Sequence, residues 1–144
     1  MEKPQEHFSQ FRQNSSVRKK TVLLIDDSQD LLDVNKTILE IDDYEVLTAL
    51  CGKEALSILS AENPPDLIVL DFCLEDMSGP DFLLELEKAL PAIIESVPVV
   101  FLTGMYDVPA TKAVGKIMKP TGIDNFLAAV QHYIEVGVDR LRYN

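Results

Sequence analysis

The stretch Val22-Leu23-Leu24-Ile25-Asp26-Asp27 decides how the chain can fold, because four consecutive apolar residues end abruptly in two acids. Four residues are too few for a helix, and the run favours a strand. A second run of this kind, Leu67-Ile68-Val69-Leu70, also ends in an acid, Asp71. Uninterrupted apolar runs are typical of central strands in a parallel sheet that is covered on both faces. The two stretches therefore predict neighbouring strands of such a sheet.

Outward from these runs, strand-like and helical patterns alternate along the chain. Further strands are predicted over 44–50, 97–102 and 114–118, and helices over 29–41, 52–62, near 80–90 and from 123 to 141. Five strands alternating with helices predict an α/β domain, and right-handed crossovers place helices on both faces. We expect a doubly wound, five-stranded parallel sheet of flavodoxin-like type, with strand order 2-1-3-4-5.

Charge divides the chain of 144 residues into two parts. The formal net charge is −11, from 24 acidic and 13 basic side chains. Residues 1–20 are polar, hold two acids and five bases, and predict a flexible extension. Residues 21–144 hold 22 acids and eight bases, and we expect them to form the one folded domain. An acidic domain argues against nucleic-acid binding and favours a cation or a basic surface as partner.

Composition also bears on the compartment. No apolar run approaches the roughly 20 residues that span a bilayer, and the first residues lack the apolar core of a secretory signal. Cys51 and Cys73 are the two cysteines, and we expect reduced thiols, with a structural bridge as the alternative. The sequence thus predicts a cytoplasmic protein without membrane insertion.

Polar residues stand where the predicted strands end. Asp26 and Asp27 close the first strand, Asp71 the third, Thr103 the fourth and Lys119 the fifth. In an open parallel sheet, ligands bind outside the carboxyl ends of the strands, so these side chains should converge. Taken singly, each has a plainer interpretation: a loop acid that caps a helix, a turn residue or a solvent-facing lysine.

Together these residue types indicate phosphoryl chemistry. Three neighbouring carboxylates repel one another and call for a counter-cation, and oxygen ligands favour Mg²⁺. A lysine ammonium and a threonine hydroxyl suit phosphoryl oxygens, and a carboxylate can accept a phosphoryl group as a nucleophile. The predicted site would accept phosphate on an aspartate, with Mg²⁺ neutralising the charge.

These motifs, each at the end of its own strand, resemble the receiver domain of two-component response regulators over residues 21 to about 137. The resemblance implies a phosphoacceptor signalling domain that catalyses its own phosphorylation and dephosphorylation, and no enzyme acting on outside substrates. The implied phosphodonor is a sensor histidine kinase or a histidine phosphotransfer protein, docking around Gln29 to Lys36. Because no output segment follows, we expect a stand-alone receiver that signals through a downstream protein partner.

The resemblance also assigns roles to single residues. Asp71 is the implied phosphoacceptor, and Mg²⁺ is held by Asp26, Asp27, Asp71 and the backbone carbonyl of Cys73. Thr103 is implied as the switch hydroxyl and Lys119 as the cation that pairs with the phosphoryl group. Pro120 would follow a cis peptide bond, and Gly79 matches the family's loop glycine.

Three features depart from the family pattern. Glu75 stands where the family has proline, and Lys116 where it has the switch aromatic. The interval from Thr103 to Lys119 is short by about a turn and a half of helix. We therefore expect the fourth helix, between strands four and five, to be shortened or absent. We interpret Lys116 as an ordinary surface lysine, with a functional substitute for the aromatic as the alternative, and Tyr106 could stand in as a mobile aromatic.

Two further hypotheses compete with regulated phosphorylation. An atypical receiver could bind its partner independently of phosphorylation, given Lys116 and the short fourth helix. A Mg²⁺-dependent phosphohydrolase with Asp71 as nucleophile is the other, although Cys73 stands where such enzymes have a second acid.

Overall fold

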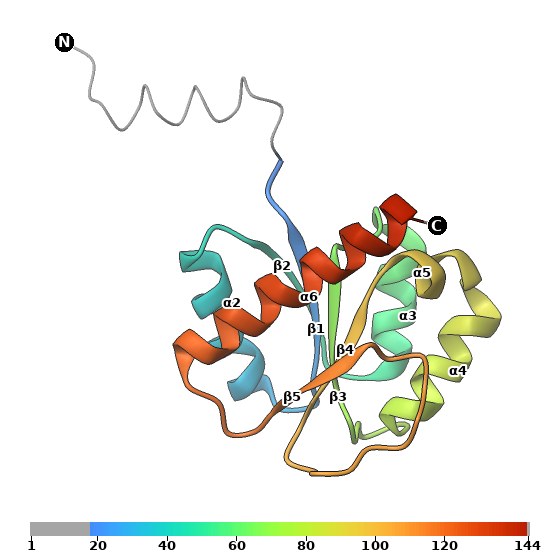
Figure 1. Cartoon of the computed structure of the whole chain (residues 1–144). Helices are drawn as coiled ribbons and strands as arrows, with labels where there is room; N and C mark the ends of the chain where they lie inside the picture. Colours follow the sequence, from blue (N-terminus) through green and yellow to red (C-terminus); the bar gives the residue numbers. More distant parts are fainter. Residues whose placement is uncertain (1–17, 144) are drawn as a thin grey trace.

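The computed structural model describes residues 18–143, and their five strands form one parallel sheet in the order β2-β1-β3-β4-β5 (Figure 1). This confirms the predicted fold class and strand order. The strands are β1 (Thr21–Ile25), β2 (Glu45–Ala49), β3 (Leu67–Asp71), β4 (Val99–Thr103) and β5 (Gly115–Met118). The helices are α2 (Gln29–Ile41), α3 (Gly52–Ala61), α4 (Gly79–Ala89), α5 (Pro91–Ser96) and α6 (Ile123–Tyr143).

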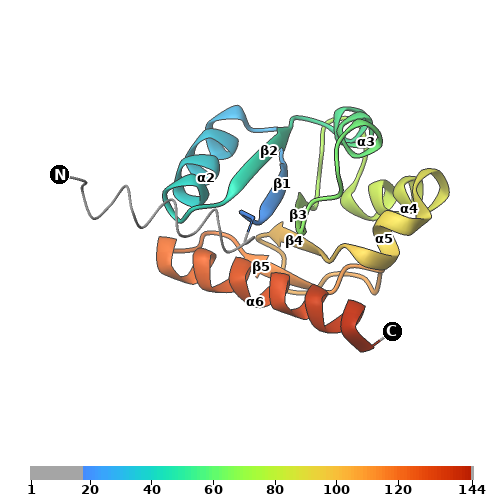
Figure 2. The ribbon, with the colours of Figure 1, turned by 90° about the horizontal axis from the view of Figure 1, so that it is seen from above.

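Helices cover both faces of the sheet, as the view in Figure 2 shows. One face packs against α2 and α6 through Leu32, Leu39, Phe126, Val130 and Ile134. The opposite face packs against α3, α4 and α5 through Ala55, Leu59, Phe82, Leu83, Leu86, Ile93 and Ile94. Because β1 and β3 bury side chains on both faces, their sequences are apolar without alternation.

Serines start the helices that follow the two acid-bearing strands. The Ser28 hydroxyl oxygen accepts a hydrogen bond from the backbone N–H of Leu31 at 3.3 Å, at the start of α2. The Ser78 hydroxyl does the same for Asp81 at 3.1 Å, at the start of α4. Such caps satisfy N–H groups that the helix itself leaves unpaired. They define where the loops after β1 and β3 end.

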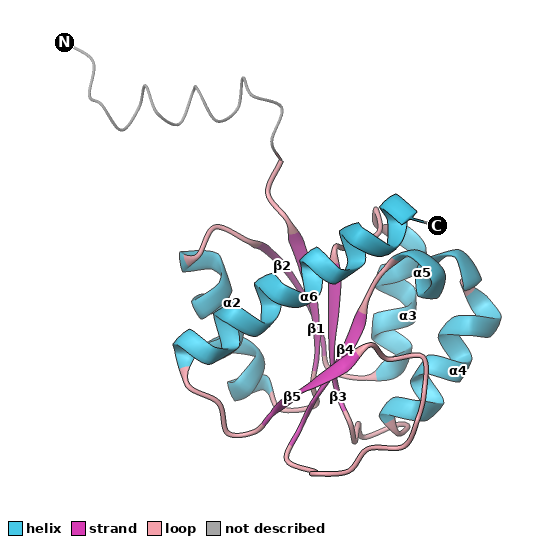
Figure 3. Ribbon diagram, in the orientation of Figure 1, coloured by secondary structure: helices cyan, strands magenta, loops and turns pink. Residues whose placement is uncertain are grey.

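Two segments between α4 and β5 differ from a regular alternation of strand and helix. Residues 104–114 form a loop without helix (Figure 3), which confirms the predicted loss of the helix between the fourth and fifth strands. The short helix α5 was not predicted. It begins with Pro91, a residue suited to the first helical position, and it buries Ile93 and Ile94. Six residues are too few to show a helical period in the sequence.

The start of the described chain is bound to the domain. Arg18 pairs with Asp66 at 3.1 Å, and the backbone N–H of Thr21 donates to the same carboxylate at 2.8 Å. Residues 1–17 of the predicted extension lie outside the described residues. Over residues 18–143, no helix is both long and apolar enough to cross a membrane.

Candidate functional site

The register of the strands brings the predicted site residues to one edge of the sheet. Pairing of β1 with β3 places Asp26 beside Asp71. Pairing of β3 with β4 places Thr103 one step beyond Asp71, and pairing of β4 with β5 places Lys119 one step beyond Thr103. The backbone N–H of Lys119 donates to the Thr103 carbonyl at 2.8 Å, which continues this alignment past the last strand.

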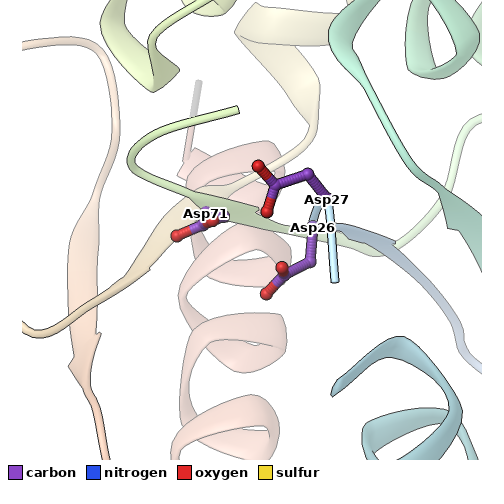
Figure 4. A group of neighbouring side chains, drawn as sticks. All are labelled: Asp26, Asp27 and Asp71. Carbon is purple, nitrogen blue, oxygen red and sulfur yellow. The ribbon is translucent and has the colours of Figure 1, made fainter. Parts of the chain in front are cut away.

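Three carboxylates gather at this edge (Figure 4). Asp26 and Asp27 leave the end of β1, and Asp71 ends β3. One oxygen from each lies within 4.8 Å of the others. Asp26 is buried, Asp71 is partly buried and Asp27 is exposed, so the cluster is open to solvent on one side.

Lys119 supplies the cation that faces this cluster. Its Nζ lies 3.2 Å from Asp71 Oδ1 and 3.5 Å from Asp26 Oδ2. One ammonium against three carboxylates leaves two formal negative charges uncompensated. A divalent cation would therefore neutralise the remaining formal charge of the site.

The two oxygens of Asp26 also indicate that the site can bind a cation. Oδ1 accepts a hydrogen bond from the backbone N–H of Ser28 at 2.9 Å. Oδ2 is buried and accepts no hydrogen bond, and its contact with Lys119 Nζ at 3.5 Å is a charge interaction without one. A bound cation would satisfy this atom, and a set of carboxylate oxygens suits a hard ion such as Mg²⁺. The residues present thus fit the metal that the resemblance implies.

The environment of Asp71 makes its ionised form less stable than it would be in water when no metal is bound. Burial raises the pKa of its carboxyl, and the neighbouring charge of Asp26 raises it further. The charge and hydrogen bond of Lys119 oppose this rise without cancelling it. A divalent cation would reverse the balance, because it stabilises the carboxylate.

The other residues to which the sequence assigns a role in the site have the following positions and contacts. Thr103 is 3% exposed, and its hydroxyl oxygen accepts a hydrogen bond from the backbone N–H of Met105 at 3.0 Å. An accepting hydroxyl still has its own proton to donate. The Lys119–Pro120 peptide bond is cis. Cys73 is exposed, and its thiol is free, as is that of Cys51.

Gly79 allows the loop after Asp71 to pack closely against the sheet. Its backbone N–H donates to the Phe72 carbonyl at 2.6 Å. A Cβ at this position would lie 2.7 Å from the Phe101 ring and 3.1 Å from the carbonyl oxygens of Asp71 and Phe72. A larger residue at this position would therefore force the loop or the Phe101 ring to shift.

Gly79→Ala is expected to lower the free energy of unfolding by about 2 kcal/mol, because overpacking at backbone and ring atoms cannot relax. Urea denaturation measures this loss. Gly122→Ala is the matched control, since a Cβ there meets nothing within 4 Å, and it should cost less than about 1 kcal/mol. Equal losses in the two variants would contradict the close packing at Gly79.

Lys116 contacts the loop that replaces the fourth helix. Its Nζ donates a hydrogen bond to the Tyr106 carbonyl and lies 5.5 Å from the centroid of the Tyr106 ring. The cation on β5 thus binds an aromatic residue on the 104–114 loop. Tyr106 itself is 85% exposed.

Asp76 is a site-loop residue that the sequence prediction missed. Its carboxylate accepts hydrogen bonds from the backbone N–H groups of Gly52 and Lys53 at the start of α3. The sequence indicates only half of this contact: Cys51 is a poor helix cap, so α3 needs an acceptor, but nothing identifies Asp76 as its source.

Comparison with known proteins finds response regulators among the relatives of this chain. Transcriptional regulatory protein KdpE of Mycobacterium tuberculosis is 39% identical over 116 residues, which cover 76% of this chain and 49% of that protein. Response regulator SaeR of Staphylococcus epidermidis is 34% identical over 82 residues, which cover 57% of this chain and 33% of that protein. The chain spans at most about half the length of these curated relatives.

Solved structures show the same fold. A CheY-like receiver domain protein from Methanospirillum hungatei matches with a TM-score of 0.74 at 26% identity, over 85% of this chain and 98% of that one. A receiver domain from Clostridium thermocellum matches with a TM-score of 0.69 at 31% identity, over 81% and 94%. The family model of the response regulator receiver domain matches residues 22–131. By sequence, by fold and by the side chains at its strand ends, this chain belongs to the response regulator receiver domain family.

Proposed function

We propose that residues 21–144 form a receiver that accepts a phosphoryl group on Asp71 from a phosphohistidine. Receiver domains are signalling domains of two-component systems. One observation carries the assignment of the acceptor: the Asp71 carboxylate meets Lys119 at 3.2 Å and shares one edge of the sheet with Asp26 and Asp27.

In the proposed transfer, a carboxylate oxygen of Asp71 forms a bond to phosphorus while the bond from phosphorus to the histidine nitrogen breaks. The electron pair of that bond stays on the imidazole. Hydrolysis later returns the carboxylate when a water oxygen attacks the phosphorus and releases inorganic phosphate. Asp71 attacks as the carboxylate, and a cation in the site would offset the burial and the Asp26 charge that raise its pKa.

Asp26, Asp27, Asp71 and the Cys73 carbonyl would hold Mg²⁺, which neutralises negative charge on the carboxylates and the phosphoryl oxygens. Lys119 already pairs with the acceptor and would remain paired with the phosphoryl oxygens. The Thr103 hydroxyl, which accepts from the Met105 N–H and keeps its own proton, would donate that proton to another of these oxygens.

The donor would be a sensor histidine kinase or a histidine phosphotransfer protein, docking along Gln29 to Lys36. Leu31 and Val34 support this surface, since they expose 40% and 54% of their area beside the acid-bearing loop. The output would be contact with a downstream protein. The two free thiols support a reducing compartment such as the cytoplasm.

Peptide mapping tests the assignment of the acceptor. The protein is incubated with Mg²⁺ and acetyl phosphate, and the acyl phosphate is then reduced with borohydride, which converts a phosphorylated aspartate to homoserine. We expect the modification at Asp71 and at no other carboxylate. Homoserine at Asp26 or Asp27, or no modification, would contradict the proposal.

A second candidate is a receiver that binds its partner without regulated phosphorylation. The contact of Lys116 with Tyr106 favours this second candidate. Lys116 binds the 104–114 loop from the position at which the family has its switch aromatic. No observation favours the phosphohydrolase, since an exposed thiol at Cys73 cannot replace a second acid.

The two candidates predict different responses of this loop. If phosphorylation is regulatory, Mg²⁺ with beryllofluoride should move Thr103 and shift the NMR signals of Met105 and Tyr106, whose backbone follows the Thr103 hydroxyl. The exposed end of α6, for example Asp139, should stay unchanged and serves as the internal control. Beryllofluoride that shifts the signals of Asp71 but leaves this loop unchanged would favour the phosphorylation-independent module.

A further inference from the structure

Helix α3 has no cap of its own. Its N-cap residue Cys51 makes no side-chain hydrogen bond to the helix. The missing acceptor comes from the loop after β3: Asp76 Oδ1 accepts from the Gly52 N–H at 2.9 Å, and Oδ2 accepts from the Lys53 N–H at 3.1 Å. Asp76, more than twenty positions away in the sequence, thus caps α3. In most helices a Ser, Thr or Asp at the N-cap position itself provides this cap.

The capping carboxylate is held in its ionised form. Desolvation alone would raise the pKa of Asp76, but the hydrogen bonds from Gly52 and Lys53 lower it overall. The positive end of the helix dipole acts in the same direction. Met77 closes the contact, because its Sδ lies 2.6 Å from where a Cβ on Gly52 would be. The tip of the loop therefore lies directly on the first turn of α3.

Backbone contacts also cross the same loop between its tip and Asp71. The Leu74 N–H donates to the Met77 carbonyl at 3.0 Å, and Cys73 forms a β-bridge with Ser78. The end of β2 before α3 is bound in turn to the other acid-bearing strand, since the Asp26 N–H donates to the Ala49 carbonyl at 3.1 Å. Asp76 thereby links the loop that follows Asp71 to the start of α3, and the end of β2 just before α3 is bound to Asp26.

We propose that Asp76 is a positioning residue for the metal site: by anchoring the loop to α3, it fixes the Cys73 carbonyl relative to Asp26 and Asp71. The inference rests on the proposed function for the role of the Cys73 carbonyl. Residues that orient metal ligands without touching the metal typically change affinity 10- to 100-fold when removed. Asp76→Ala should therefore weaken Mg²⁺ binding roughly tenfold.

A second substitution separates positioning from helix stability. Cys51→Ser gives α3 a local cap, so the double variant Asp76→Ala/Cys51→Ser should recover the thermal midpoint lost in Asp76→Ala. The loop would remain unanchored in the double variant. Calorimetric Mg²⁺ titration should therefore still show a dissociation constant about ten times higher than that of the wild type. Hydrogen exchange at the Gly79 N–H should also still be faster than in the wild type.

Each outcome decides the inference. Weak Mg²⁺ binding that persists in the double variant supports it, whereas recovery of both stability and affinity shows that Asp76 is only a helix cap and overturns it. Unchanged Mg²⁺ affinity in Asp76→Ala with normal phosphorylation overturns this inference and leaves the proposed function intact. If the wild type binds Mg²⁺ but no phosphoryl group, the proposed function fails while the positioning role of Asp76 is still measured.

Discussion

Lys119→Met is expected to lower the free energy of unfolding of the metal-free protein by about 2–3 kcal/mol. The reason is that the buried Asp26 and the partly buried Asp71 lose the one cation that pairs with them among the described residues. Removing one partner of a buried ion pair costs about 3–5 kcal/mol, and the loss here is smaller because Lys119 keeps 29% of its side chain exposed. Urea denaturation in a chelating buffer measures it.

Mg²⁺ should restore part of this stability, and its stabilising effect should be larger in Lys119→Met than in the wild type, because the site is more negative. Phosphorylation should still fall roughly tenfold or more, since the phosphoryl oxygens lose a positioned charge. Lys112→Met is the matched control: its partner Glu87 lies at 2.6 Å, but both side chains are exposed, so the substitution should leave the free energy of unfolding nearly unchanged. Equal costs for the two lysines, or no extra Mg²⁺ effect, would contradict this account.

Asp71→Asn is expected to raise the stability of the metal-free protein at neutral pH. The folded state raises the pKa of Asp71, so it binds a proton more tightly than the unfolded chain does. Stability therefore falls as the pH rises from the unfolded value through the raised folded value, and at neutral pH the carboxylate is destabilising. A neutral amide removes this loss, and the midpoint of thermal unfolding should shift upward.

Two conditions reverse or remove the difference. As the pH is lowered toward the raised pKa of Asp71, the wild type becomes protonated there and the two proteins should converge. With Mg²⁺ at ten times its dissociation constant, the wild type should gain about 1.4 kcal/mol, and Asp71→Asn should gain less. A variant that is less stable than the wild type without metal, or that responds equally to Mg²⁺, would show that Asp71 is not part of the charge cluster.

Much of the fold could be predicted because its signals are local. The apolar runs before Asp26 and Asp71 indicate buried parallel strands, and chain order alone then places both acids at the same edge of the sheet. The short interval between Thr103 and Lys119 likewise predicts the missing helix. These features depend on periodicity and on counting residues, which the sequence contains directly.

Other features depend on contacts between distant segments. The cap that Asp76 provides for α3 crosses from one loop to another, and no spacing in the sequence encodes it. The hold of Lys116 on Tyr106 depends on how the 104–114 loop returns to β5. Helix α5 is too short to show a period, and burial of Ile93 and Ile94 stabilises it more than local propensity does.

The most direct test of the central claim is the intact mass of the protein after incubation with Mg²⁺ and acetyl phosphate, compared among the wild type, Asp71→Asn and Asp139→Asn. Asp139 is an exposed aspartate on α6, so its substitution controls for the loss of one carboxylate. We predict one added phosphoryl group in the wild type and in Asp139→Asn, its loss when Mg²⁺ is chelated, and none in Asp71→Asn. An adduct that persists in Asp71→Asn, or none in the wild type, would contradict Asp71 as the acceptor.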